Sequence, residues 1–102
     1  MEIHAAVAAL SALAQPHRLA AFRLLVQAGP EGLPVGEVRS ALDIPGATLT
    51  AHLHVLRQAG LVTDRREGRV IRCFADYGQM NTLMGYLSEN CCGGARACLP
   101  GC

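Results

Sequence analysis

The chain lacks lysine, long apolar runs and any large net charge, and each absence excludes something. All nine basic residues are arginine and the formal net charge is only +1, so the overall charge does not by itself indicate a nucleic-acid partner. No stretch approaches the roughly 18 consecutive apolar residues that a membrane-spanning helix requires. A hydrophobic content of 51% over 102 residues is typical of one small globular domain, whose modest core favours dimerisation.

The N-terminus also lacks the positive charge of a secretory signal. Residues 5–14 are rich in alanine and leucine, but Glu2 stands where such a signal carries positive charge, and the same segment has helical spacing. We therefore expect a cytoplasmic protein. Thiols stay reduced in that compartment, and clustered cysteines there bind metals or react more often than they form structural disulfides.

Apolar residues at helical spacing predict four helices in the first sixty residues. The apolar stripe of the first helix holds Ile3, Val7, Leu10 and Ala14. The expected inward positions of the next three helices are Leu19, Phe22, Leu25 and Val26, then Val35, Val38 and Leu42, then Leu49, Leu53 and Leu56. Pro16 and Pro34 suit helix starts, and Gly60 is placed to end the fourth helix in a left-handed conformation. The tight turn at 43–46 makes the third and fourth helices a helix-turn-helix.

Two β-branched segments, 61–63 and 70–74, follow as strands, and Gly68 supplies the positive-φ turn of a hairpin between them. A last amphipathic helix carries Tyr77, Met80, Leu83, Met84 and Leu87 and ends by Asn90. This order of four helices, two strands and a final helix predicts a mainly α winged helix-turn-helix. We assign residues 1–90 to DNA binding and dimerisation, and residues 91–102 to a cysteine-rich tail.

The fourth helix has the residue types of a recognition helix on the side away from its leucines. Small and hydroxylated side chains let a backbone lie deep in the major groove. Five arginines between positions 57 and 72, against two acids, are typical of a phosphate-facing patch, and a solvated hairpin face is the open alternative. The arginines of the hairpin itself can reach the flanking phosphates or the minor groove. The predicted DNA contacts are Ala47, Thr48, Thr50, Ala51, His52, His54 and Arg57 on the helix, and Arg65, Arg66 and Arg69 on the hairpin. A packed or capping role suits His52 equally well.

Residues 13–19 (LAQPHRL), 48–62 (TLTAHLHVLRQAGLV) and 65–69 (RREGR) resemble the ArsR/SmtB family of metal-responsive winged-helix repressors. The resemblance covers about residues 5–90. It implies a homodimer, paired through the first and last helices, that occupies operator DNA until an inducer binds. It also implies a regulator and not an enzyme, with no membrane partner and no organic substrate.

Departures from the family pattern indicate where the sensor site lies. The CxC of arsenic sensors is absent from the third helix, and residues 77–90 hold no histidine for the zinc pattern of the last helix. Four of the five cysteines instead fall in the last twelve residues. The segment 89–94 (ENCCGG) resembles the branch of arsenic-responsive members in which a vicinal cysteine pair follows the last helix, with a third cysteine further on.

Thiolates select soft ions. Trivalent arsenic takes three sulfurs, which Cys91, Cys92 and Cys98 can supply, because Gly93 and Gly94 let the chain turn back. We therefore expect As(III), or Sb(III), to release the repressor from DNA. Zinc prefers four ligands, and Cys102 makes a Zn(II) or Cd(II) site an open alternative. Thiol oxidation with Cys98 as the resolving cysteine is another.

Cys73 has a different expected role. It lies in the second predicted strand, where Ile71, Cys73 and Ala75 alternate. A lone strand cysteine of this kind usually serves as a small buried hydrophobe. A thiol reductase is disfavoured for the whole chain, because no CxxC occurs in a βαβ setting.

Overall fold

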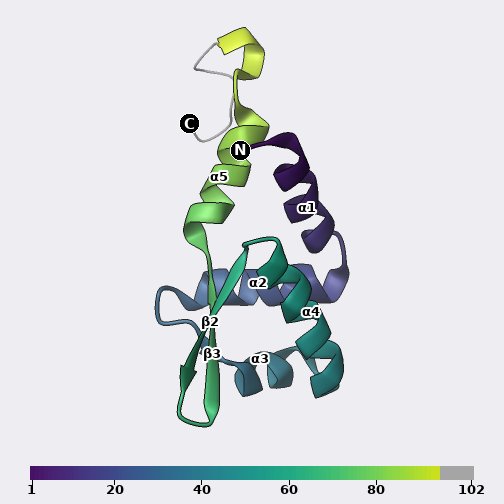
Figure 1. Cartoon of the computed structure of the whole chain (residues 1–102), viewed down its shortest axis with the longest axis vertical. Coiled ribbons are helices and arrows are strands. Elements are labelled where there is room, and N and C mark those ends of the chain that lie inside the picture. The colour runs from purple at the N-terminus through teal and green to yellow at the C-terminus, as the bar shows by residue number, and fades with distance from the viewer. Residues whose placement is uncertain (95–102) are drawn as a thin grey trace.

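The computed structural model describes residues 1–94 and confirms the predicted winged helix-turn-helix. Its elements are α1 (Ile3–Leu13), α2 (Pro16–Ala28), β1 (Leu33–Pro34), α3 (Val35–Leu42), α4 (Gly46–Gln58), β2 (Val62–Glu67), β3 (Val70–Ala75), α5 (Tyr77–Ser88) and a 3₁₀ segment, Cys91–Gly94. Helices α1 and α5 lie at one end of the molecule, and the β2–β3 hairpin projects at the other (Figure 1). None of the helices within residues 1–94 is long and apolar enough to cross a membrane.

The sheet is antiparallel with strand order β1-β3-β2, and the register of the hairpin runs from Val62 opposite Ala75 to Glu67 opposite Val70. Strand β1 was not predicted, because two residues are too few to show alternation. It forms because Leu33 pairs with Cys73. Gly32, just before it, has φ +64°, and a Cβ there would lie 2.2 Å from the carbonyl oxygen of Cys73. Only glycine therefore fits at position 32.

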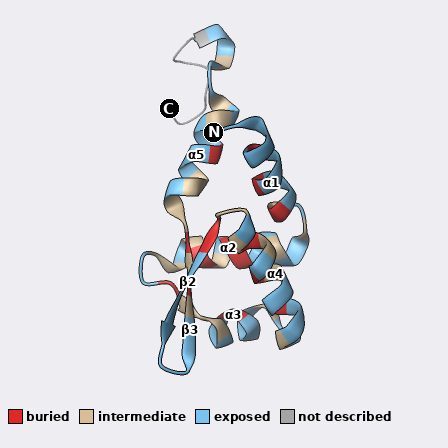
Figure 2. Ribbon diagram, in the orientation of Figure 1, coloured by how far each residue is buried: buried red, intermediate tan, exposed pale blue. Residues whose placement is uncertain are grey.

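The core lies where α2, α3 and α4 meet the base of the hairpin (Figure 2). Leu49, Leu53 and Leu56 are buried as predicted. The prediction for Leu19 was wrong, because 44% of this residue is exposed. Helix α2 packs instead through Ala21, Phe22 and Leu25, and this inward stripe places Leu19 on the flank of the helix.

Helix α1 turns its small residues inward. Ala6, Ala9 and Ala12 are at most 2% exposed, while Ile3 and Val7 are each 58% exposed. Alanine allows a helix to approach its neighbours closely, since it has no side chain beyond Cβ. The predicted apolar stripe of α1 therefore exists, but it faces away from the core of its own chain.

The start of α5 is defined by a cap within the helix and by a hydrogen bond to the helical body. The Asp76 carboxylate accepts a hydrogen bond from the backbone N–H of Gln79 at 2.9 Å, as a capping residue does at a helix N-terminus. The Tyr77 hydroxyl donates to the carbonyl oxygen of Val26 on α2 at 3.0 Å. These bonds hold the first turn of α5, while its later turns extend alongside α1 (Figure 1).

Candidate nucleic-acid interface and thiol segment

The helix-turn-helix presents the N-terminal half of α4 as an open surface of small side chains. Residue Asp43, in the turn after α3, adopts a left-handed conformation with φ 52°, which redirects the chain into α4. The predicted contact residues that are exposed on α4 are Ala47, Thr48, Thr50, Ala51 and His54. The Thr50 hydroxyl donates to the carbonyl oxygen of Gly46 at 2.9 Å, so the lone pairs of its oxygen point outward as acceptors.

His52 packs against α2 and is only partly exposed. Its Nδ1 lies 3.5 Å from Nη1 of Arg18, and its ring centroid is 5.8 Å from that of His17. Arg18 is itself held by the carbonyl oxygen of Ala12, which accepts from its Nε at 2.7 Å. Burial, followed by the charges of Arg18 and His17, lowers the pKa of His52. Of its two predicted roles, these contacts favour packing over base reading.

Arg57 joins the recognition helix to the wing. Its guanidinium forms an ion pair with the carboxylate of Asp64 on β2. Asp64 also lies opposite Cys73 in the hairpin register. A predicted phosphate contact is therefore engaged within the protein, where it fixes the angle between α4 and the hairpin.

A second set of ion pairs stiffens the hairpin around Glu67. Its carboxylate accepts from Arg65 at 2.8 Å and from Arg72 at 3.0 Å. Hydrogen bonds from Arg72 and then from Arg65 hold the pKa of Glu67 below its ordinary value. The Arg65 guanidinium also lies 5.0 Å from the centroid of the Phe74 ring. Much of the positive charge of Arg65 is thus offset locally.

Arg66 and Arg69 carry the positive charge at the tip of the wing. Both are exposed, and within residues 1–94 neither forms an ion pair. Arg66 donates to the carbonyl oxygen of Gly68 at 3.3 Å, a contact that leaves its charge unopposed. The structure thereby separates the three predicted wing arginines into one that is paired and two that are available to phosphates.

The cysteines fall into two environments. Cys73 is fully buried, as predicted, and burial, together with the nearby carboxylate of Asp64, raises the pKa of its thiol to about 12. Cys91 is partly exposed and Cys92 is exposed, both in the 3₁₀ segment that follows α5. Cys92 has φ 53° and Gly93 has φ 69°, so the chain bends sharply at the vicinal pair.

The predicted third and fourth sulfurs, those of Cys98 and Cys102, lie outside the described residues. Within residues 1–94, no three His, Cys, Asp or Glu side chains gather closely enough to hold a metal ion. The three-sulfur site therefore stays a prediction, and so does the boundary between a domain at 1–90 and a tail at 91–102.

Sequence reasoning missed two residues that shape this surface. Asp64 was counted only as an opposing charge, and its pairing with Arg57 spans the end of α4, where no local periodicity relates the two positions. Arg18 was not singled out, although it ties α1, α2 and α4 together. The motif LAQPHRL contained it, but only the packing of α2 against α4 shows its contacts.

A family model described as a helix-turn-helix domain matches residues 13–65, just over half of the chain. The chain belongs to this helix-turn-helix family. The match runs from the end of α1 to the middle of β2, and so includes both helices of the motif and part of the first strand of the hairpin.

Several known proteins resemble this chain to different extents. A biofilm growth-associated repressor of Agrobacterium fabrum is 44% identical over 62 residues, which are 61% of this chain and 50% of that protein. The chain thus matches about half the length of this curated relative. HlyU from Vibrio cholerae N16961 is 30% identical with a TM-score of 0.71, over 90% of this chain and 99% of HlyU.

A third similar protein is a homodimeric winged helix-turn-helix DNA-binding domain from Mycobacterium bovis, described as a possible ArsR-family transcriptional regulator. It is 24% identical with a TM-score of 0.68, over 92% of this chain and 87% of that one. At this level of identity the likeness concerns the fold. It agrees with the winged architecture built above from the residues.

Proposed function

We propose that this helix-turn-helix protein is an ArsR-type transcriptional repressor that binds operator DNA as a homodimer. The observation that carries the proposal is the joint exposure of the small-residue face of α4 and of Arg66 and Arg69 on the adjoining wing, which have no ion-pair partner among residues 1–94. A helix with small residues suits the major groove, and a flexible arginine pair suits the flanking phosphates. One relative is named as a repressor, which supports repression of transcription and not activation.

Dimerisation through α1 and α5 is supported by the apolar side chains that these two helices leave exposed. They are Ile3, Val7, Leu10, Met84 and Leu87, between 42% and 58% exposed, and we call this set the terminal-helix patch. Both helices lie at the same end of the molecule (Figures 1 and 2). Large apolar side chains exposed on two neighbouring helices favour association, and a two-fold dimer would bring two recognition helices to two half-sites.

The inducer that we propose is As(III) or Sb(III), held by the thiolates of Cys91, Cys92 and Cys98. Support comes from the place of the vicinal pair directly after α5, at the end of the proposed dimer helix, and from the preference of soft ions for sulfur. Ordering of the segment after α5 would change the spacing of the two winged domains. A coupling free energy of about 1–3 kcal/mol per site suffices for such a response.

Zn(II) or Cd(II) sensing, with Cys102 as a fourth ligand, is the second candidate. It rests on the tetrahedral preference of zinc and on the number of tail cysteines. Reversible oxidation of the same thiols is the third candidate. All three place the sensor in the tail and leave the DNA surface unchanged, so one experiment separates them.

The test is fluorescence anisotropy of the full chain on DNA from upstream of its own gene, under reducing conditions, because only thiolates bind the ions. Arsenite and antimonite should release the DNA, whereas zinc should not. The triple variant C91S/C92S/C98S should bind DNA as the wild type does and should not respond. The variant C73S is the matched control and should respond fully.

Each rival outcome is distinct in this assay. Release by zinc or cadmium alone, lost in C102S, would replace arsenite by a four-sulfur site. Release by peroxide without metal, measured after the reductant has been removed and reversed by dithiothreitol, would establish a redox sensor. Arsenite release that persists in the triple variant would remove the tail from the mechanism, and failure of the wild type to bind DNA would overturn the repressor proposal itself.

A further inference from the structure

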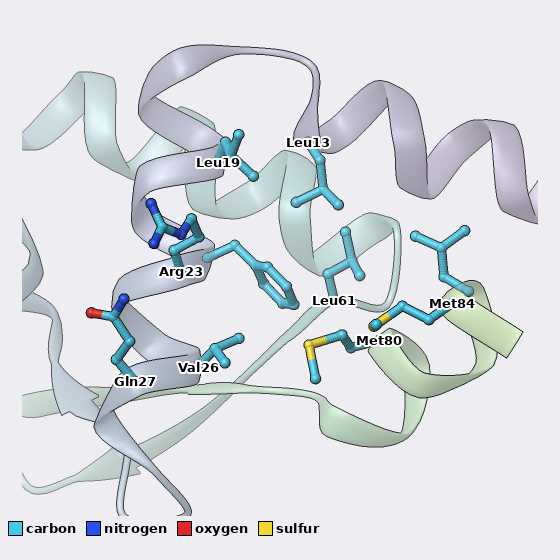
Figure 3. Close-up of a pocket in the computed structure, with 10 residues that line it drawn as sticks. Leu13, Leu19, Arg23, Val26, Gln27, Leu61, Met80 and Met84 are labelled. Carbon is cyan, nitrogen blue, oxygen red and sulfur yellow. The ribbon is translucent and has the colours of Figure 1, made fainter. Parts of the chain in front are cut away.

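A cavity of about 450 Å³ lies between α2 and α5, away from both the recognition surface and the thiol segment. Its walls come from separate elements. Leu19 and Val26 lie on α2, Leu61 directly precedes β2, and Met80 and Met84 lie on α5 (Figure 3). This volume falls in the range of small-molecule sites in proteins, which are usually apolar clefts with a few polar groups. Of the lining residues just named, the proposed repressor mechanism uses only Met84, which also belongs to the terminal-helix patch.

The lining is apolar except at one edge. Phe22 and Leu83 are almost fully buried and close the inner wall, while two methionines form most of the wall on α5 (Figure 3). Unbranched, polarisable methionine side chains adapt to ligands of different shape. A body of aromatic rings or methylene groups would therefore replace water favourably in this space.

The exception is the edge formed by Arg23 and Gln27, one helical turn apart on α2 (Figure 3). Arg23 is exposed, and within residues 1–94 no acidic side chain pairs with it. Other arginines around the sheet, such as Arg57 and Arg65, do have carboxylate partners. An unpaired guanidinium beside an apolar cavity is complementary to a carboxylate on an apolar ligand, because Arg binds carboxylates through two parallel hydrogen bonds.

We propose that this cavity binds a small apolar carboxylate, an aromatic or medium-chain acid, with its body between α2 and α5 and its anionic end on Arg23. The Tyr77 hydroxyl bonds the first turn of α5 to α2. A ligand in the cavity would add a contact between α2 and the later turns of α5. The site is independent of the cysteines, and it gives the protein an organic ligand that its sequence did not suggest.

Calorimetric titration of the full-length protein tests the site. The probes are 2-naphthoate, the neutral 2-naphthalenemethanol and the cationic 2-naphthylmethylammonium, which share one apolar body. Naphthoate should bind with a dissociation constant on the order of 1 mM or tighter, given the efficiency typical of small ligands, and the cation should bind at least about tenfold more weakly.

Two variants and one control locate the site. R23Q should weaken naphthoate binding about tenfold and leave the alcohol unchanged, because only the charge is removed. L19Q, at a position exposed enough to tolerate glutamine, should weaken both ligands, because it makes the wall polar. R39Q, on the exposed face of α3, is the control and should bind naphthoate as the wild type does.

Three results would overturn the proposal. If neither naphthoate nor the alcohol binds the wild type, the cavity is closed in the assembled protein by a second copy of the chain. If naphthoate binds but neither R23Q nor L19Q weakens it, the ligand occupies another place. If the cation binds as well as naphthoate, Arg23 does not select the charge.

Discussion

The recognition half of the molecule and its terminal helices use apolar residues in opposite ways. In α4, the leucines at helical spacing, Leu49, Leu53 and Leu56, face inward and are at most 2% exposed. In α1, the large residues Ile3 and Val7 at the same kind of spacing face outward, and alanines pack inside. Amphipathic periodicity thus identifies an apolar face, but it does not tell which partner covers that face.

This difference has a physical basis in the area that each half can bury. A chain of about 100 residues has a small core of its own, and here that core is filled by α2, α3, α4 and the sheet. Of the terminal helices, α1 contributes buried alanines to it and α5 contributes Leu83. Their larger side chains remain available to a second chain, and the following experiments test this division from the largest expected effect to the smallest.

The largest expected difference between the recognition half and the terminal end of the molecule is in thiol reactivity, which Cys73 and Cys92 report. At pH 8 a thiol with a pKa of about 12 is ionised in only about one molecule in ten thousand, and burial blocks the reagent as well. Iodoacetamide should therefore alkylate Cys92 in the reduced native protein and leave Cys73 intact until urea unfolds the chain. Peptide mass spectrometry measures both, and rapid native alkylation of Cys73 would contradict the buried thiol.

Leu56→Ala should lower the free energy of unfolding by about 2–5 kcal/mol, because it empties a fully buried position in the core. Urea denaturation followed by circular dichroism measures the loss, which should be the same at all protein concentrations. Leu10→Ala is the comparison from the terminal helices. Its effect should appear only where the protein is dimeric, and an equal, concentration-independent loss would place Leu10 in the core.

Val7→Asp should dissociate the dimer without unfolding the chain. A carboxylate at a position that is 58% exposed in one chain costs little there, but burial of that charge in an interface is expensive. We expect the dimer dissociation constant to rise at least about tenfold in sedimentation equilibrium. Ala5→Asp, exposed on the same helix outside the terminal-helix patch, is the control, and equal dissociation by both variants would argue against this interface.

Arg66→Ala should weaken binding to all DNA sequences and reduce the slope of log K against log salt by about one, because one phosphate contact is lost. Arg65→Ala should change the slope less, since Glu67 already offsets the charge of Arg65. Anisotropy titrations at several salt concentrations give both slopes. Equal slopes for the two variants would mean that the Glu67 ion pair opens on DNA.

His52 should give the smallest effect, a change in the pH dependence of stability. Its pKa is lowered in the folded chain, so the unfolded chain binds the proton more readily. The stabilisation is complete above the ordinary pKa of about 6.5 and is lost as the pH falls through the lower folded value. Wild type should therefore lose more stability than His52→Gln between pH 7.5 and 5, and parallel curves from urea denaturation would contradict this.

Much of the fold could be predicted because local signals agreed with one another. Leucine spacing placed α4, Gly60 ended it with φ +77°, and Gly68 marked the hairpin turn with φ +64°. Strand β1 could not be predicted, since Leu33 and Pro34 become a strand only by pairing with β3. The prediction that Leu19 faces inward failed for a similar reason. The inward stripe of α2 depends on how this helix is rotated against α4 and the sheet.

The sequence predicted which segments carry the candidate DNA contacts, but it did not show how the charges in those segments pair. Sequence showed five arginines and two acids between positions 57 and 72, and could not say which charges cancel. The structure pairs Arg57 with Asp64 and places Arg65 and Arg72 on Glu67. Within residues 1–94, Arg66 and Arg69 have no acidic partner, a result that depends on strand register and side-chain reach.

The sequence by itself determined the order of the helices and the hairpin, because helix spacing and turn residues are local properties of the chain. Only the tertiary structure decided which faces are covered, which arginines are paired and where a cavity remains between α2 and α5. These depend on contacts between residues far apart in the sequence. Such contacts follow from the packing of whole elements against one another and leave no periodic signal in any single segment.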